Sequence, residues 1–383
     1  MNFDFTDEQK ALKDEARRFL ADASSLSVAR GVLEGRSDGF DQRLWDRLIE
    51  QGWTGTAIPE EYGGYGIGYI ELCAVAEELG RALSPVPFAS TIYQFAEALL
   101  LAGSQVQKQV LLPGVVAGEV IGTLAVAEGP GEVAMARVAT RYADGRLTGT
   151  KLPVVDGAAA THAVVLASTD SGTGLFLVDL TGPGVRRGPV TTIDPTRGAA
   201  RLVFDGAAAE PLGHGGDGLN LLAGIEQRAA VMIAFEQLGG ADRCLEMARD
   251  YALDRYAFGR PIGGYQAIKH KLADVFTKIT IARANAYYGA WALSTDAPEL
   301  PVAASAARVA ASEAFWYAAK EAIQVFGGIG VTWEADNHLF YRRARHLALV
   351  LGGPSVWKRR LVDALEDRLA AEAATAGTEM EAA

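Results

Sequence analysis

Long amphipathic runs in the C-terminal half are the feature that most limits how this chain can fold. A helical period of apolar residues begins near residue 219 and continues almost to the end of the 383-residue chain. The runs are rich in alanine and cover about residues 219–256, 266–294, 301–327, 337–351 and 356–370. Helices of this length and composition are typical of a four-helix bundle. We therefore expect a helical bundle over residues 216–370, followed by a small, acidic, disordered tail at 371–383.

A break in this pattern, residues 255–271, separates the first two runs. Gly259-Arg260-Pro261 ends one helix, and helical periodicity resumes at Gln266. The two helices should meet at a tight cationic corner, where free backbone N–H groups and positive charge suit an anion such as a phosphate. Arg255 and Gln266 flank this corner as a charged and a neutral donor. The alternative is a plain helix–turn–helix corner with a solvated face.

The N-terminal region, residues 1–119, also has the pattern of a helical domain. Thr6 and Gln9 form a capping box ahead of an amphipathic run. A later helix carries Glu77 and Glu78 on its polar side.

A different pattern fills residues 120–215. Short runs of β-branched residues alternate with turn residues at a spacing that predicts a compact antiparallel sheet or barrel. The strands that we expect here include residues 137–142, 146–151, 163–167 and 174–179. The chain should therefore be mainly α-helical, with a small β domain between two helical domains.

Composition limits the partners and the compartment. The net charge of −11 argues against binding to nucleic acid or to an anionic membrane, and no apolar run is long enough to span a bilayer. Cys73 and Cys244 are too few to imply a disulfide framework, so we expect a cytoplasmic protein. The five histidines are scattered and predict no metal site.

Three motifs follow one another along the chain. They are Ile-Pro-Glu-Glu-Tyr-Gly-Gly at 58–64, Arg-Tyr-Ala-Phe-Gly-Arg-Pro-Ile at 255–262 followed by Gln266-Ala267-Ile268, and Gln-Val-Phe-Gly-Gly-Ile-Gly at 324–330. In this order and spacing they resemble the acyl-CoA dehydrogenase superfamily over nearly the whole chain. The resemblance implies an N-terminal helical domain, a central β barrel or sandwich and a C-terminal four-helix bundle.

The same resemblance implies an FAD flavoprotein that acts on acyl-CoA thioesters. In the family, a carboxylate removes the alpha proton and the flavin takes the beta hydride. Because an alpha C–H is weakly acidic, the carbonyl must be polarised and the base must be held in a dry pocket. The resemblance also implies a dimer or a dimer of dimers, in which each flavin site spans two subunits, and an electron-transfer flavoprotein as electron acceptor.

By this resemblance, six residues would contact an FAD that lies mainly against the neighbouring subunit. An arginine suits a diphosphate, and paired glycines permit close approach of the backbone. The residues are Arg255, Phe258 and Gln266 at the diphosphate and adjacent parts, and Gln324, Gly327 and Gly328 under the adenosine portion.

Two β-domain segments depart from the family pattern. The place of the family's Thr-Glu-Pro motif reads Val126-Ala127-Glu128-Gly129-Pro130-Gly131, which has no hydroxyl. The place of its Trp-Ile-Thr-Asn-Gly motif reads Pro153-Val154-Val155-Asp156-Gly157, with Val155 in place of the Thr. Polar atoms of a flavin ring buried there would lack partners from this chain, at about 1–3 kcal/mol each.

The usual catalytic base is also replaced. Counting from Phe326 by the family's spacing reaches Leu351, which cannot accept a proton. A minority of the family carries the base on the first bundle helix, where gapless counting reaches Ala229. Glu226 and Glu236 are the nearby acids that could take its place, as displaced bases or as structural carboxylates.

Three hypotheses follow from this pattern. The chain resembles the base-lacking subunit of heteromeric α2β2 acyl-CoA dehydrogenases of bacterial steroid side-chain degradation, so a second acyl-CoA dehydrogenase subunit would hold the flavin ring and the base. Alternatively, it is a self-sufficient homomeric acyl-CoA dehydrogenase with a displaced Glu. A third alternative is a member that does not dehydrogenate, either a flavin-dependent oxygenase or an assembly subunit.

Overall fold

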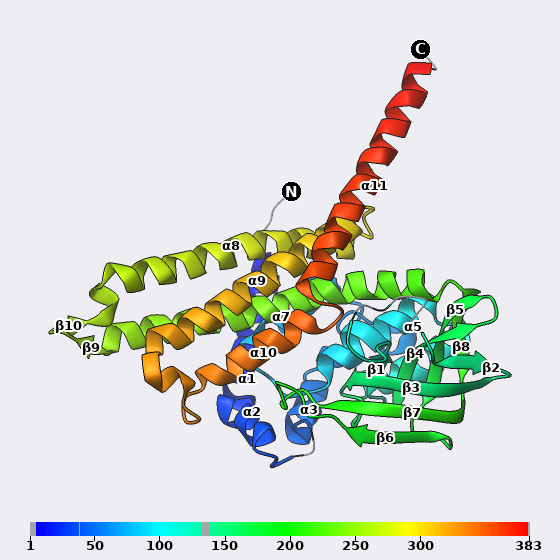
Figure 1. Ribbon diagram of the computed structural model, residues 1–383, viewed down its shortest axis with the longest axis horizontal. Coiled ribbons are helices and arrows are strands. Elements are labelled where there is room, and N and C mark those ends of the chain that lie inside the picture. Colours follow the sequence, from blue (N-terminus) through cyan, green and yellow to red (C-terminus); the bar gives the residue numbers. More distant parts are fainter. Residues whose placement is uncertain (1–4, 38, 132, 134–137, 382–383) are drawn as a thin grey trace.

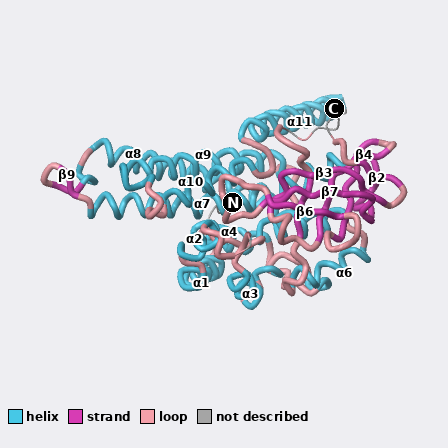
Figure 2. The backbone as a smooth tube through the Cα atoms, turned by 60° about the horizontal axis from the view of Figure 1, so that its bottom comes forward, coloured by secondary structure: helices cyan, strands magenta, loops and turns pink. Residues whose placement is uncertain are grey.

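The computed structural model describes residues 5–37, 39–131, 133 and 138–381, without the side chains of residues 214–215 and 371–381. N-terminal helices, a β-sheet and a helical bundle follow one another along the chain (Figure 1). The sheet lies at one end of the molecule, and the bundle extends away from it (Figure 2).

The N-terminal helices begin with the predicted capping box, in which Thr6 and Gln9 cap each other's backbone N–H groups. The α-helices are α1 (Asp7–Ala23), α2 (Leu26–Leu33), α3 (Gln42–Glu50), α4 (Tyr69–Arg81), α5 (Glu97–Ala102) and α6 (Gln105–Val116). A fully buried π-helical segment, η3 (Ala89–Ala96), leads directly into α5. Such segments are rare and are often found at functional sites.

The β region forms one eight-stranded sheet in the order β6-β7-β3-β2-β4-β5-β8, with β1 paired to β4. The strands are β1 (Gly122–Ala125), β2 (Arg141–Ala143), β3 (Arg146–Val155), β4 (His162–Thr169), β5 (Gly172–Asp179), β6 (Val185–Pro189), β7 (Ala199–Ala208) and β8 (Glu210–Gly216). Most pairs are antiparallel, as predicted, but β4 pairs in parallel with β1 and β2. Part of the expected strand over residues 137–142 lies outside the described residues.

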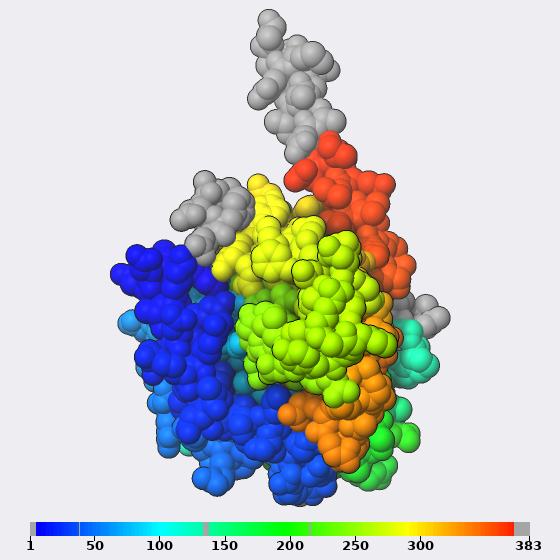
Figure 3. All heavy atoms as spheres, turned by 90° about the vertical axis from the view of Figure 1, so that its left-hand side faces the viewer, coloured from blue at the N-terminus to red at the C-terminus, as the bar shows by residue number. Residues whose placement is uncertain are grey.

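The C-terminal helices are α7 (Gly218–Asp254), α8 (Gln266–Ser294), α9 (Leu300–Phe326), α10 (Asn337–Leu349) and α11 (Pro354–Glu381). Between α7 and α8, β9 (Tyr256–Ala257) and β10 (Arg260–Pro261) pair as a short hairpin. This segment projects at the free end of the bundle and stands at the front of the end-on view (Figure 3).

Residues 371–383 are the segment predicted to be a disordered tail. Helix α11 continues to Glu381 through most of residues 371–383. The physical reason is composition: alanine and glutamate, which fill this segment, have high helix propensity.

Helices α4 and α7 touch through their backbones at glycines. A Cβ added to Gly239 would lie 1.7 Å from the carbonyl oxygen of Glu77, and one at Gly80 would lie 1.9 Å from that of Glu236. A side chain at either position would separate the two helices, so the N-terminal helices lie directly on the bundle.

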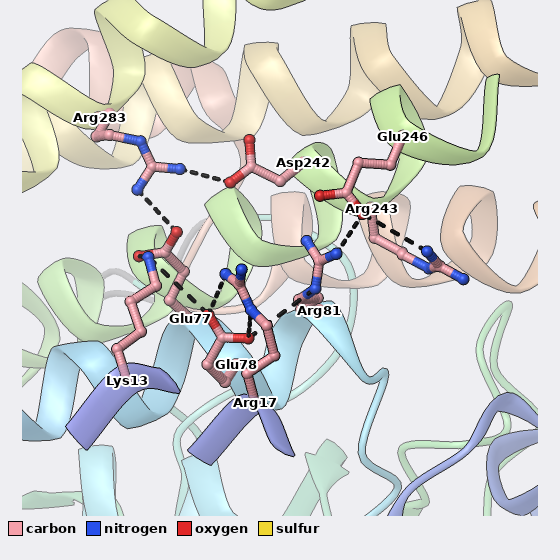
Figure 4. Close-up of polar contacts among 9 residues, drawn as sticks. All are labelled: Lys13, Arg17, Glu77, Glu78, Arg81, Asp242, Arg243, Glu246 and Arg283. Atoms are coloured by element: carbon pink, nitrogen blue, oxygen red, sulfur yellow. Dashed lines mark hydrogen bonds and ion pairs between the residues drawn. The ribbon is translucent and has the colours of Figure 1, made fainter. Parts of the chain in front are cut away.

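A network of charged side chains also connects α1, α4, α7 and α8 to one another (Figure 4). Glu77, which is almost fully buried, lies 2.6 Å from Lys13 Nζ and 2.7 Å from Arg283 Nη1. Burial by itself would raise the pKa of Glu77, but the two cations outweigh it and hold this pKa below its ordinary value. The carboxylates predicted on a polar face therefore lie inside the molecule.

Candidate functional site

A cavity of about 550 Å³, here called the Leu351 cavity, lies where the sheet meets the bundle. Its volume is in the range of ligand pockets. Its walls come from η3, the ends of β1 and β3, α7, the loop after α10 and the start of α11. The lining residues used below are Gln94, Ala127, Val155, Glu226, Leu351 and Arg360.

Leu351 lies in the loop that joins α10 to α11, and hydrogen bonds fix this loop from both sides. Arg308 on α9 donates to the carbonyl oxygen of Val350 at 2.7 Å, and Trp357 Nε1 donates to that of Leu351 at 3.0 Å. Leu351 has a φ of 61°, a left-handed conformation that is unfavourable for leucine. The position predicted for the family's base thus carries a hydrocarbon side chain in the cavity wall.

The β-domain side of the cavity has no side-chain hydroxyl at the two positions where this sequence differs from the family's motifs. Ala127 and Val155 both line the cavity. The neighbouring Glu128 is held by Lys151 at 2.6 Å and accepts hydrogen bonds from the backbone N–H groups of Ala139 and Thr140. Its carboxylate is therefore occupied within the protein, and these side chains do not fit the polar edge of a flavin ring.

Glu226 and Glu236, the two acids that could replace the usual base, lie in different surroundings. Glu226 lines the cavity, and its Oε2 lies 2.6 Å from Arg360 Nη2. Glu236 is buried on α7 between Arg343 and Arg197, at 3.4 and 3.5 Å. Because both arginines are buried as well, Glu236 is a structural carboxylate, whereas Glu226 remains a candidate for chemistry.

The cationic corner lies at the other end of the bundle, far from the sheet (Figures 1 and 2). The ring of Tyr251 near the end of α7 stacks on that of Phe326 at 4.1 Å, so the ends of α7 and α9 lie together. All six residues predicted to contact FAD are at this end and exposed; Phe258 is 98% exposed. They are Arg255, Phe258, Gln266, Gln324, Gly327 and Gly328.

The residues at this end have the chemistry that suits a phosphate-bearing ligand. Arg255, Gln266 and Gln324 have no side-chain hydrogen bond within the described part of the chain. An added Cβ at Gly327 or Gly328 would meet no atom within 4 Å, so a ligand could lie against the backbone there. This exposed end and the Leu351 cavity lie apart in the same chain.

Another buried acid, Glu97 on α5, has no motif or spacing in the sequence that singles it out. Its carboxylate accepts a hydrogen bond from Tyr69 at 3.1 Å and lies 3.6 Å from Arg228. Burial raises the pKa of Glu97 to about 7, against the lowering effect of Arg228. A glutamate in the unfolded chain loses its proton near pH 4.5, so the folded state becomes relatively less stable as the pH rises from there to about 7.

We therefore expect Glu97→Gln, which cannot ionise, to stabilise the protein more at pH 8 than at pH 4. The difference in unfolding free energy between variant and wild type should grow by on the order of 3 kcal/mol between these pH values. Urea denaturation at both pH values measures it, with the exposed Glu61→Gln as the matched control. A difference that does not change with pH would contradict the assigned pKa.

Two further lining residues, Gln94 and Arg360, were not predicted. Both are polar residues on helices, and no motif or spacing distinguishes them from solvated positions. Among the described residues, no group of His, Cys, Asp and Glu could hold a metal ion, and no helix could cross a membrane.

Comparisons with known proteins match most of the chain to acyl-CoA dehydrogenases. Residues 6–119 match the family model "Acyl-CoA dehydrogenase, N-terminal domain", and residues 216–364 match "Acyl-CoA dehydrogenase, C-terminal domain". The chain is 36% identical over 356 residues to the acyl-CoA dehydrogenase IpdE2 of Mycobacterium tuberculosis, covering 93% of this chain and 96% of that protein.

Two similar solved structures are complexes or paired chains. One is a variant of the Tcur3481-Tcur3483 steroid ACAD, with a TM-score of 0.86, 32% identity, and coverage of 95% of this chain and 99% of that chain. The other is the ChsE4-ChsE5 complex from Mycobacterium tuberculosis, with a TM-score of 0.87, 29% identity, and coverage of 96% and 99%.

Proposed function

Since this chain belongs to the acyl-CoA dehydrogenase family, we propose that it is the base-lacking subunit of a heteromeric acyl-CoA dehydrogenase. A partner subunit would hold the flavin ring and the catalytic carboxylate. The observation that carries the proposal is Leu351 in the cavity wall. The six residues expected at a flavin, here called the exposed half-site, lie away from this cavity at the free end of the bundle. A homomer of this chain would lack a carboxylate at the family's usual position in every site.

Each residue of the exposed half-site has a physical role in this proposal. Arg255 would pair with the diphosphate of FAD in the partner's site, since a guanidinium offers several donors in one plane. Gln266 would donate a neutral hydrogen bond beside it, as Phe258 contacts the adjacent part of the cofactor. Gln324, Gly327 and Gly328 would lie under the adenosine portion, which the two glycines let approach the backbone. When bound, FAD would supply the oxidation that forms the alpha,beta double bond.

The relatives support the nature of the partner and substrate. The steroid ACAD and the ChsE4-ChsE5 complex each pair two differently named chains, so the partner proposed here is a second acyl-CoA dehydrogenase subunit in an α2β2 tetramer. The substrate would be a bulky, steroid-type acyl-CoA, and an electron-transfer flavoprotein would accept the electrons. Co-expression with acyl-CoA dehydrogenase genes from the same genome, followed by a dehydrogenation assay, tests this: the complex should be active and the chain alone inactive.

A second candidate function rests on Glu226. Its carboxylate lines the Leu351 cavity, so a self-sufficient homomer could use it as the base. Against this, the Glu226 carboxylate is already paired with Arg360 at 2.6 Å, whereas a base must be able to reach the alpha proton of a substrate.

We expect Glu226→Gln to keep at least half of the activity of the complex, because the base belongs to the partner. The amide preserves the shape of the side chain and a contact to Arg360, so folding should be little affected. Loss of turnover by several orders of magnitude with unchanged flavin content would instead identify Glu226 as the base. Glu61→Gln, an exposed position, is the matched control.

A further inference from the structure

The segment that joins α9 to α10, residues 327–336, begins with two residues of the exposed half-site. Gly327 and Gly328 open its 3-10 helix, η6 (Gly327–Val331). Three of its apolar side chains are at least half exposed: Ile329, Val331 and Trp333. Side chains that are exposed in this way contribute little packing energy, so the conformation of the segment depends on the specific contacts that hold it.

The first part of the segment rests on α9. Gly327 has a φ of 67°, which lets the chain turn back at the end of the helix. A Cβ added to Gly330 would lie 2.7 Å from the carbonyl oxygen of Ile323, so the two backbones touch there. These contacts hold residues 327–330, and the course of residues 331–336 is set by contacts to other elements.

The last part of the segment is held by Arg30, a residue of α2 in the N-terminal domain. Its Nη1 donates to the carbonyl oxygen of Trp333 at 2.7 Å, and its Nη2 lies 2.7 Å from Asp336 Oδ1. The Arg30 side chain is 17% exposed. Because a guanidinium is planar and its donors lie at fixed positions, two such bonds set both the distance and the orientation of the segment.

Trp333 is held through its ring as well as through its carbonyl group. The ring stacks on that of His338 on α10, with 5.1 Å between centroids and 21° between planes. His338 Nε2 also lies 3.1 Å from the Trp333 carbonyl oxygen. Arg30 and His338 therefore fix the same residue from α2 and from α10.

We propose that Arg30 is a positioning residue for the flavin site that this chain completes. The proposal rests on the proposed function, in which Gly327 and Gly328 lie under the adenosine portion of FAD. A contact made by backbone alone depends on the course of the chain, and Arg30 would set that course by holding Trp333 and Asp336. The motif at 324–330 ends before both of these residues, so it does not point to Arg30.

Hydrogen–deuterium exchange of the chain purified alone tests the positioning step without a partner subunit. The Thr332 amide donates to the carbonyl oxygen of Ile329 at 3.0 Å. Arg30→Ala should speed exchange of this amide by about tenfold, because the segment opens more easily after loss of a charged hydrogen bond. Exposed Arg36, which pairs with Glu34 at 2.7 Å, supplies the control Arg36→Ala. Unchanged exchange in Arg30→Ala, or equal exchange in the two variants, would overturn the proposal.

Titration of the flavin-free complex with FAD tests the consequence for the site. Arg30→Ala should weaken FAD binding by about tenfold, and excess FAD should restore the activity, which it could not do for a misfolded complex. Asp336→Ala removes the other partner and should have a similar effect, so the test does not depend on a single variant. Glu334→Ala, an exposed acid of the same segment, is the control for Asp336→Ala.

A double-mutant cycle with Gly328→Val links Arg30 to the glycines. A Cβ at Gly328 meets no atom within 4 Å in this chain, so the variant should fold but hold the adenosine portion away. In that background Arg30→Ala should weaken FAD binding by no more than about twofold, because the contact that it positions is already lost. Equal losses in both backgrounds would contradict the positioning role.

The failure of this proposal can be told apart from the failure of the proposed function. If Arg30→Ala left the FAD affinity unchanged while Arg255→Ala lowered it, the positioning role alone would be wrong. If neither variant lowered the FAD affinity, the exposed half-site itself would be wrong.

Discussion

Arg255→Ala is expected to deplete the assembled complex of flavin and to remove most of its activity. The side chain is exposed in this chain and, under the proposal, donates to the diphosphate across the subunit interface. Loss of hydrogen bonds to a charged group weakens binding by about 1.5–3 kcal/mol, which is about a tenfold to a hundredfold loss of flavin affinity. Titration of the flavin-free complex with FAD measures the affinity directly.

A neighbouring arginine provides the control for this effect. Arg249 lies earlier on α7, is exposed, and pairs with Asp250 at 2.7 Å. Arg249→Ala removes the same charge from the same helix, so it reports any general electrostatic effect on an anionic cofactor. Equal flavin affinity in the Arg255 and Arg249 variants would contradict the role given to Arg255.

Arg343→Met should be the most destabilising of the substitutions considered. Arg343 is 1% exposed, and its guanidinium lies 2.6 Å from Asp194 and 3.4 Å from Glu236. It joins α10 to the loop before β7 and to α7. Removing one partner of a buried ion pair leaves uncompensated charge, so we expect a loss of about 3–5 kcal/mol in unfolding free energy.

Urea denaturation measures this loss, and Arg345→Met is its matched control. Arg345 is two residues away and, within the described residues, its guanidinium packs over the ring of Trp316 at 4.7 Å without an ion pair, so its loss should be about 1 kcal/mol. If both variants lost the same small amount, Arg343, Asp194 and Glu236 would not form a stabilising network. Glu236→Gln in the complex should lower stability without changing the rate per folded enzyme.

The bundle could be predicted because its helices are long and their apolar period is uninterrupted. The same argument failed for Glu77 and Glu78, which a helical pattern places on a polar face. Burial of these acids depends on Lys13 and Arg283, which come from distant parts of the chain. No local pattern contains that information.

The sequence predicted a residue of the candidate site only where its position could be counted from a family motif. Counting from Phe326 placed the base position at Leu351, and the structure puts that residue in the cavity wall. Gln94 and Arg360 could not be found, since a glutamine in an apolar segment and an arginine on a charged helix look the same whether or not they line a cavity. Whether they line a cavity depends on how distant elements pack, which is a property of the fold.

The flavin content of the purified heteromeric complex tests the central claim most directly. Absorbance of the released flavin, divided by the protein concentration of each chain, gives the number of flavins per tetramer. The base-lacking proposal predicts one flavin for every two chains, and none on this chain purified alone. One flavin per chain, or a yellow and active homomer of this chain, would contradict it.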